Sequence, residues 1–173
     1  MNFERVYSIA NKWTFKIKPI KKLLDQEMNG GIWIDPYAGM NSPATITNDI
    51  NPKMPTQHHL EADEFVRRFI DSSVDGVLLD PPYSYGQFKE CYQEVGSKPP
   101  LDIFNTRYEA RVKKEISRIV KPNGKVISFG WNSDGIGKHR GFEMYRVLLV
   151  YYGGHKYDTI VTVERKINRS LFE

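Results

Sequence analysis

The tetrapeptide Asp80-Pro81-Pro82-Tyr83 has the residue types of an amine-methylating site. It follows the apolar run Val77-Leu78-Leu79, so a strand would deliver the Asp80 carboxylate to its carboxyl end. The two prolines hold φ near about −65° and make the following turn rigid and extended. An amino group lying between the Asp80 carboxylate and the Pro81 carbonyl donates both hydrogens, which leaves its nitrogen lone pair available for attack. Tyr83 would stack on the ring that carries the amine. By itself the tetrapeptide is equally consistent with an ordinary turn.

Composition sets the class of protein without choosing a function. The chain has 173 residues, the size of one domain, and a net charge of +4 that permits but does not establish contact with polyanions. The single cysteine, Cys91, excludes an internal disulfide and suits a reducing compartment. No apolar run approaches the roughly 20 residues of a membrane span, and residues 1–5 do not lead into a signal peptide. We therefore expect a soluble cytoplasmic protein.

Hydrophobic periodicity alternates between helix and strand along the chain. In order, we expect helix 19–28, strand 32–34, strand 44–49, helix 60–70, strand 76–79, helix 103–120, strand 125–129 and two β-rich runs at 144–152 and 157–165. The last two runs are joined through Gly153-Gly154 and predict an antiparallel hairpin. The pattern indicates an α/β protein with a Rossmann-like, mostly parallel sheet and this hairpin at or near an edge.

Acidic residues stand beside turn formers at three of the expected strand ends. They are Asp35-Pro36, Asp49 before Asn51-Pro52, and Asp80-Pro81. In open parallel sheets, ligands bind outside the carboxyl ends of the strands near the topological switch point. The three carboxylates should therefore converge on one crevice.

This set of motifs resembles that of the S-adenosylmethionine-dependent DNA amino-methyltransferases, which methylate adenine N6 or cytosine N4. Asp35-Pro36-Tyr37-Ala38-Gly39 resembles the family's cofactor loop, where the glycine lets the backbone approach the cofactor. Asp80 to Tyr83 resembles the catalytic motif, and a final tyrosine is common among adenine methylases. The resemblance spans about residues 14–166 and is strongest to short, solitary phage-borne adenine methylases. It implies a class I methyltransferase fold in one domain, residues 1–173, without a separate target-recognition domain, in a bacterial or phage-infected cell.

The resemblance also implies roles for individual residues. The Asp49 carboxylate, beside Ile50, would accept the cofactor's ribose hydroxyls, Asp63 would read the cofactor adenine, and Phe15 would lie over the methionine end. The implied cofactor-binding set is Phe15, Asp35, Pro36, Tyr37, Ala38, Gly39, Asp49, Ile50 and Asp63, and the implied catalytic set is Asp80, Pro81, Pro82 and Tyr83.

Two further stretches bear on nucleic acid and on metals. In the segment after the strand 125–129, Trp131 and Asn132 can flank a flipped base while Lys138 or Arg140 contacts phosphate, although a solvated glycine-rich loop explains the segment equally well. Lys16, Lys18, Lys21 and Lys22 can also touch nucleic acid, but a solvated helix face is the commoner explanation. His58-His59 lacks zinc-ligand spacing, so no metal is expected.

One departure from the family concerns the first crossover. Asp49 follows Gly39 by only ten positions, interrupted by Pro43, whereas a parallel crossover normally needs a dozen or more residues. We therefore expect a loop in place of the first helix.

The expected activity is direct methyl transfer to adenine N6 in DNA, with the target base flipped out or unpaired. An RNA or protein-amide methyltransferase, or a non-catalytic module that binds nucleic acid or cofactor, remains open from the sequence alone.

Overall fold

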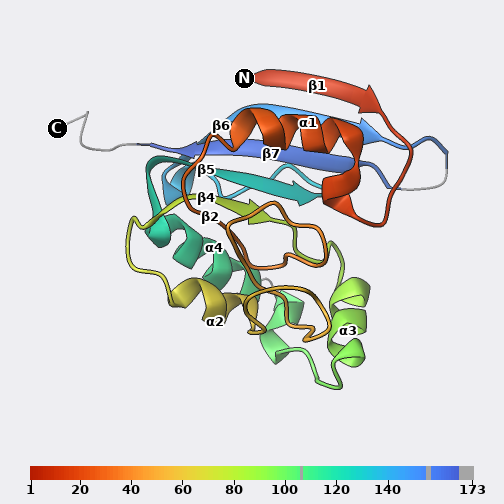
Figure 1. The fold of residues 1–173 in the computed structure, drawn as a ribbon, viewed down its shortest axis with the longest axis vertical. Helices are drawn as coiled ribbons and strands as arrows, with labels where there is room; N and C mark the ends of the chain where they lie inside the picture. Colours follow the sequence, from red (N-terminus) through yellow and green to blue (C-terminus); the bar gives the residue numbers. More distant parts are fainter. Residues whose placement is uncertain (106, 155–156, 168–173) are drawn as a thin grey trace.

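The computed structural model describes residues 1–105, 107–154 and 157–167. Its described strands form one seven-stranded sheet in the order β1-β6-β7-β5-β4-β2-β3 (Figure 1). The strands are β1 (Asn2–Tyr7), β2 (Trp33–Asp35), β3 (Ile46–Thr47), β4 (Val74–Leu79), β5 (Val120–Gly130), β6 (Phe142–Tyr151) and β7 (Thr159–Lys166). The helices are α1 (Lys18–Glu27), α2 (Ala62–Arg67), α3 (Tyr85–Glu94) and α4 (Arg107–Ile119), with 3-10 turns η1 (Thr14–Lys16), η2 (Leu101–Asn105) and η3 (Lys138–Arg140).

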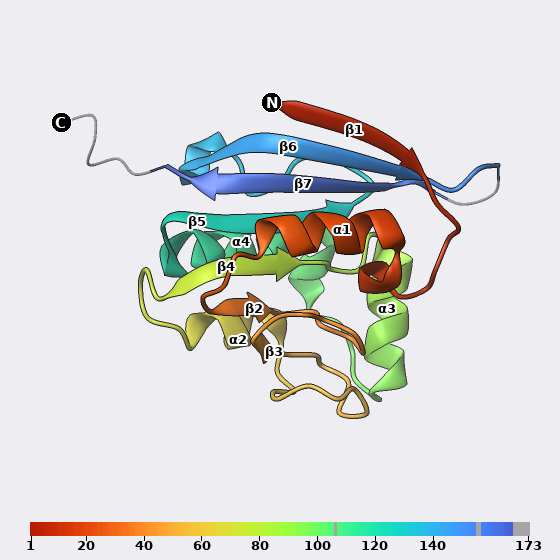
Figure 2. The same cartoon turned by 45° about the horizontal axis from the view of Figure 1, so that its top comes forward.

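Only β7 runs against its neighbours among the described strands. It is antiparallel to both β5 and β6, and every other adjacent pair is parallel. Figure 2 shows β4 and β5 pointing towards α3 and β7 pointing the opposite way. The expected mostly parallel α/β sheet with a C-terminal antiparallel hairpin is confirmed.

Helices cover both faces of the sheet (Figure 2), and the sheet separates the hydrophobic core into two layers. On one face α1 buries Ile20 and Leu23 against strand residues such as Leu78. On the other face α2 and α4 bury Val66 and Ile116 against the opposite sides of the same strands. Because β4 and β5 are apolar on both sides, they are the central strands, as is usual in parallel sheets.

The hairpin lies further inside the sheet than the sequence indicates. β7 inserts between β5 and β6, and β1 adds a parallel strand outside β6. β1 was not expected from the sequence, because the side chains of this edge strand are at most half-buried and both Phe3 and Tyr7 are exposed, so clear apolar alternation is absent.

Residues 121–124, between the expected helix 103–120 and the expected strand 125–129, lie within a strand. α4 ends at Ile119, and β5 begins at the next residue with Val120 paired to Val74. The next pair joins Gly76 to Lys125, so the intervening residues form an irregularity in the ladder, with Asn123 at φ +64°. The helix stop is therefore correct, and the strand begins five residues earlier than expected.

The connection from β2 to β3 contains no described helix, which confirms the expected loop. Residues 36–45 form turns, and β3 still pairs in parallel with β2. The chain then returns through α2 to β4, on the other side of β2. The strand order thus reverses between β2 and β4, so the carboxyl ends of these strands border the expected ligand crevice.

No helix in the described part of the chain is long and apolar enough to cross a membrane.

The sheet packing predicts a specific sensitivity at Gly76. A Cβ at this position would lie 2.5 Å from ring atoms of Trp33, which is buried on the paired strand β2. Gly76→Ala should lower the free energy of unfolding by about 1–3 kcal/mol, measured by urea denaturation. The control is Gly86→Ala in α3, where the nearest atom would be 3.7 Å away. It should leave stability unchanged or raise it by up to about 1 kcal/mol. An unchanged midpoint for Gly76→Ala would show that the Trp33 ring can move aside.

Candidate active site

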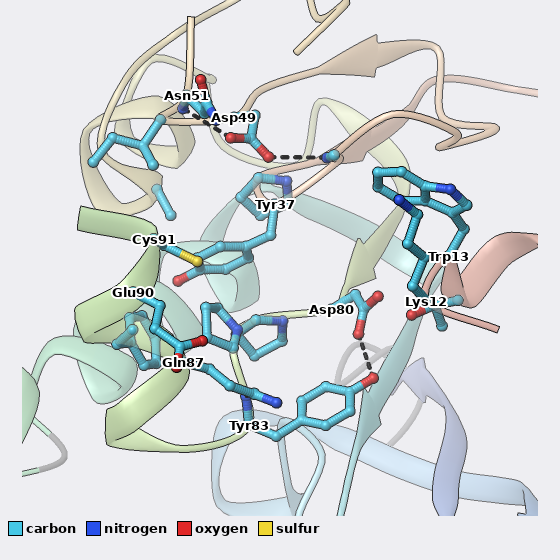
Figure 3. A pocket seen from close by; sticks show the side chains of 18 of the residues that line it. Lys12, Trp13, Tyr37, Asp49, Asn51, Asp80, Tyr83, Gln87, Glu90 and Cys91 are labelled. Atoms are coloured by element: carbon cyan, nitrogen blue, oxygen red, sulfur yellow. Dashed lines mark hydrogen bonds between the residues drawn. The ribbon is translucent and has the colours of Figure 1, made fainter. Parts of the chain in front are cut away.

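A cavity of about 670 Å³ opens beyond the carboxyl ends of β2, β3 and β4. This volume lies within the usual range for small-molecule sites. Figure 3 shows Asp49 on one side, Asp80 on the other and Tyr37 between them. The structure brings together many of the residues expected from the sequence, and those that line the cavity are Pro36, Tyr37, Gly39, Asp49, Ile50, Asp80, Pro81, Pro82, Tyr83 and Trp131.

The remaining cofactor residues expected from the sequence lie behind or beside the cavity wall. Phe15 is buried against Phe129, while its neighbours Trp13 and Thr14 line the cavity. Ala38 is buried within the loop. Asp63 lies on α2, where it forms ion pairs with Arg67 and Arg111.

Asp35 is fully buried and organises the loop from within. Its carboxylate accepts hydrogen bonds from the Ser42 hydroxyl at 2.6 Å and from the Tyr37 amide at 2.9 Å. Burial, reinforced by the nearby Asp80 and Asp49 carboxylates, raises the pKa of Asp35 to about 8. Asp35 therefore positions the loop and does not face the cavity directly.

Asp49 reaches the cavity from the end of β3 and holds two loops. Its carboxylate accepts the amide of Gly39 at 3.0 Å and the amide of Asn51 at 2.8 Å (Figure 3). Gly39 has φ +56°, and a Cβ there would meet no atom within 4 Å, so the loop presents open space at this point. Partial burial raises the pKa of Asp49. A carboxylate has about four acceptor sites, so Asp49 keeps capacity for a ligand hydroxyl.

Asp80 follows β4 and is half-buried at the cavity wall. The Tyr83 hydroxyl donates to it at 2.5 Å (Figure 3). Burial raises the pKa of Asp80 to about 6, against the opposing effect of the Tyr83 and Thr14 side chains. Tyr83 thus directs its hydroxyl to the carboxylate, a contact that the sequence analysis did not anticipate.

Glu61, which was not among the residues expected from the sequence, precedes α2 and lines the cavity. Its Oε2 accepts hydrogen bonds from the hydroxyls of Tyr92 and Tyr108. Tyr92 comes from α3 and Tyr108 from α4, so this carboxylate links three helices beside the cavity. Its position in the first turn of the expected helix 60–70 was the available sequence signal.

The structure does not bring Lys138 and Arg140, the residues expected to contact phosphate, to the cavity. β6 runs parallel to β5, so η3, which precedes β6, lies at the amino edge of the sheet, opposite the cavity. Trp131 stays at the carboxyl edge because it directly follows β5 and lines the cavity. Asn132 lines a neighbouring pocket of about 160 Å³ behind Pro81 and Pro82.

The cavity wall is strongly acidic. The carboxylate residues among its lining are Asp49, Glu61, Asp80, Glu90 and Glu94, whereas Lys12 is the basic residue among the described lining. Burial together with Asp49, Glu94 and Glu90 also raises the pKa of the Cys91 thiol, which excludes an activated thiolate. Such a wall favours a ligand that carries positive charge.

The sequence matches no known protein-family model and no curated protein. Several solved structures are similar in fold. TrmN from Thermus thermophilus matches with a TM-score of 0.56 at 16% identity, over 87% of this chain and 49% of that chain. The 1,6-didemethyltoxoflavin-N1-methyltransferase of Burkholderia thailandensis, crystallised with 1,6-didemethyltoxoflavin and S-adenosylhomocysteine, matches with a TM-score of 0.57 at 11% identity, over 86% and 76%. A methyltransferase homologue from Pyrococcus horikoshii matches with a TM-score of 0.51 at 12% identity, over 80% and 62%.

These comparisons show that the chain has a methyltransferase fold. It spans about half the length of TrmN and about three quarters of the Burkholderia thailandensis enzyme. The expected α/β methyltransferase architecture is confirmed at the level of fold.

The buried Asp35 predicts a pH-dependent stability. Its pKa of about 8 lies above the usual 3.8, so between these values the folded state keeps a proton that the unfolded state has released. Stability should therefore fall as pH rises from about 4 to 8, by up to about 1.4 kcal/mol per pH unit from this group. Asp35→Asn keeps an acceptor for the Tyr37 amide and should flatten this dependence, measured by urea denaturation at pH 5 and pH 8. An equal loss of stability between pH 5 and pH 8 in the parent and in Asp35→Asn would contradict the raised pKa of Asp35.

Proposed function

We propose that this protein is an S-adenosylmethionine-dependent methyltransferase that methylates an exocyclic nucleobase amine, specifically N6 of adenine in DNA. The proposal depends chiefly on one observation: the Asp80-Pro81-Pro82-Tyr83 turn lines the same cavity as Gly39 and Asp49, which are joined by a hydrogen bond. The turn has the chemistry to hold an amine, and Asp49 has the chemistry to hold a ribose. Their shared cavity makes a transfer between two bound molecules geometrically reasonable.

The residues present fit S-adenosylmethionine. The acidic wall suits a ligand with a sulfonium and an ammonium group, and the open space at Gly39 leaves room for its close approach. Asp49 retains acceptor capacity for ribose hydroxyls. The Burkholderia thailandensis enzyme of the same fold holds S-adenosylhomocysteine, which supports the choice of cofactor.

Glu61 takes the role that the resemblance implied for Asp63. Asp63 is engaged by Arg67 and Arg111, whereas Glu61 lines the cavity. We therefore assign recognition of the cofactor adenine to the Glu61 carboxylate, oriented by Tyr92 and Tyr108.

The chemistry required of the protein is alignment and charge stabilisation. S-adenosylmethionine, when bound, supplies a methyl group activated by its sulfonium. Asp80 accepts a hydrogen bond from the target amine, stabilises the positive charge that develops on that nitrogen and receives its proton. The Pro81 carbonyl accepts the second amine hydrogen. The Tyr83 hydroxyl occupies an Asp80 oxygen in the absence of substrate, so an entering amine replaces this hydrogen bond and the Tyr83 ring becomes available for stacking.

Adenine in DNA is the substrate that agrees best with the motif, because the turn carries an aspartate and ends in tyrosine. An adenine inside a duplex must leave the stack before its amine reaches Asp80, at a cost of a few kcal/mol. Methyl transfer to RNA, to protein amides or to none of these would identify the alternatives.

Cofactor binding should depend on Asp49 and not on Asp63. Asp49→Ala removes an acceptor for the ribose hydroxyls and the anchor of the Gly39 amide, so affinity for S-adenosylhomocysteine should fall by roughly ten- to a hundredfold. Asp63→Ala should change it by less than about threefold, because this residue lies outside the cavity lining. Isothermal titration calorimetry measures both. Equal losses in the two variants would overturn the assignment.

Asp80 should separate chemistry from binding. Asp80→Ala should abolish transfer of tritiated methyl to unmethylated DNA while leaving cofactor affinity within a few-fold of the parent. Because the ionised carboxylate is the active form, kcat/KM should rise as pH passes through about 6 and then level off. Tyr83→Phe removes a hydrogen bond that lowers the pKa of Asp80, so it should keep activity and move this midpoint to higher pH.

For each expected result, a different outcome would contradict or change the proposal. Full activity in Asp80→Ala would exclude the amine-methylation mechanism. A parent that is inactive on DNA and active on RNA would retain the mechanism and change the substrate. An unmoved midpoint in the pH profile of kcat/KM for Tyr83→Phe would show that Tyr83 does not act on Asp80 in the free enzyme.

A further inference from the structure

Four lysines stand close together in the N-terminal segment without ion-pair partners among the described residues. Lys16, Lys18, Lys21 and Lys22 are exposed, and none forms an ion pair within the part of the chain that the structure describes. Elsewhere, the cations that form such pairs are Arg67, Arg68, Arg111, Lys113, Arg118, Lys121, Lys125 and Arg146. Other cations that lack such pairs within the described ranges, for example Lys53, Lys98 and Lys114, are scattered along the chain, whereas these four lysines lie close together in sequence.

This segment leads away from the mouth of the cavity. Lys12 lines the cavity and lies 4.7 Å from the ring centre of Trp13 (both labelled in Figure 3). Lys16 follows in η1, and α1 begins at Lys18. Since α1 turns its apolar side to the sheet, Lys18, Lys21 and Lys22 remain on its exposed side. We call Lys12, Lys16, Lys18, Lys21 and Lys22 the lysine track.

Aromatic side chains surround the same mouth. Trp131 and Tyr157 are 39% and 75% exposed, and their ring centres lie 4.5 Å apart. Trp131 also contacts Tyr83, with ring centres 5.7 Å apart. We call Trp13, Tyr83, Trp131 and Tyr157, all of which line the cavity, the aromatic rim. A charged track beside exposed aromatic rings is the combination that binds single-stranded nucleic acid through phosphates and base faces.

The opposite wall has the opposite charge. Glu90 and Glu94 on α3 are exposed and line the cavity. Phosphates placed there would be repelled, so the side of η1 and α1 is the more favourable approach for a polyanion. A duplex hides the faces of its bases, whereas an unpaired strand offers them to the aromatic rim.

We propose that the lysine track and the aromatic rim form a binding surface for single-stranded nucleic acid, with phosphates on the lysines and bases stacked on the rim. The strand would run along the outer side of α1 and present one base to Asp80. The fate of that base rests on the proposed function, whereas binding of the strand does not.

The test is fluorescence anisotropy of a labelled 20-nucleotide single strand and of the matching duplex, without S-adenosylmethionine, across a salt series. The parent should bind the single strand about five- to a hundredfold more tightly than the duplex. Replacing Lys16, Lys18 and Lys22 together by Gln should weaken binding and reduce the slope of log affinity against log salt by about 2, since each phosphate contact contributes about 0.7. Trp131→Ala should weaken binding by about five- to a hundredfold with an unchanged slope.

The matched control replaces Lys53, Lys98 and Lys114 by Gln. These lysines are also exposed and lie outside the track and the cavity lining, so the slope should stay that of the parent. Circular dichroism melting checks that every variant folds. Equal slopes in the two triple variants, or equal affinity for duplex and single strand, would overturn the proposal. So would lysine-dependent binding to phosphatidylserine vesicles with no binding to either oligonucleotide. Because no methyl transfer is measured, an inactive enzyme that still binds the strand would refute only the proposed function.

Discussion

The short crossover between β2 and β3 is the constraint on which the site depends. Without a helix, its ten residues must find other partners for their polar backbone groups. The buried Asn48 side chain supplies one such partner and also binds the segment before α2: its amide donates to the carbonyls of Pro36 and Leu60, and its oxygen accepts the Leu60 amide. The Asn48 carbonyl also accepts the Ala38 amide. One side chain therefore connects the loop after β2 to the start of α2, and so shapes two walls of the cavity.

Electrostatics divides the cavity and its mouth into two regions. The Asp49 and Asp80 carboxylates lie near enough to Asp35 to reinforce the burial that raises its pKa, and further acids from α3 face the same space. This concentration of negative charge suits a cationic ligand inside. Outside, the lysine track carries the opposite charge beside the aromatic rim. A cationic cofactor and a polyanionic substrate can thus approach one site from different directions without competing for the same charges.

Much of the fold and part of the site could be predicted because their signals are local. The apolar runs of β4 and β5 and the apolar stripe of α4 follow from periodicity alone. An acid that directly follows a strand in a parallel sheet must lie near the carboxyl edge, whatever the rest of the chain does. Asp49 and Asp80 therefore reach the cavity as expected, and the turn at Pro81-Pro82 comes with them.

Tertiary structure alone decided the direction of side chains away from the strand ends. Glu61 and Asp63 are two residues apart, which turns a helical side chain by about 200°, so only the packing of α2 determines that Glu61 faces the cavity. Lys138 and Arg140 lie seven and nine positions after Trp131, and the path of that segment carries them to the opposite edge. β1 joins the sheet through backbone pairing to β6, which leaves little mark on side-chain pattern. Sequence thus determined which residues follow the strands, whereas long-range packing decided which other side chains share their cavity, because such contacts depend on chain path and not on spacing.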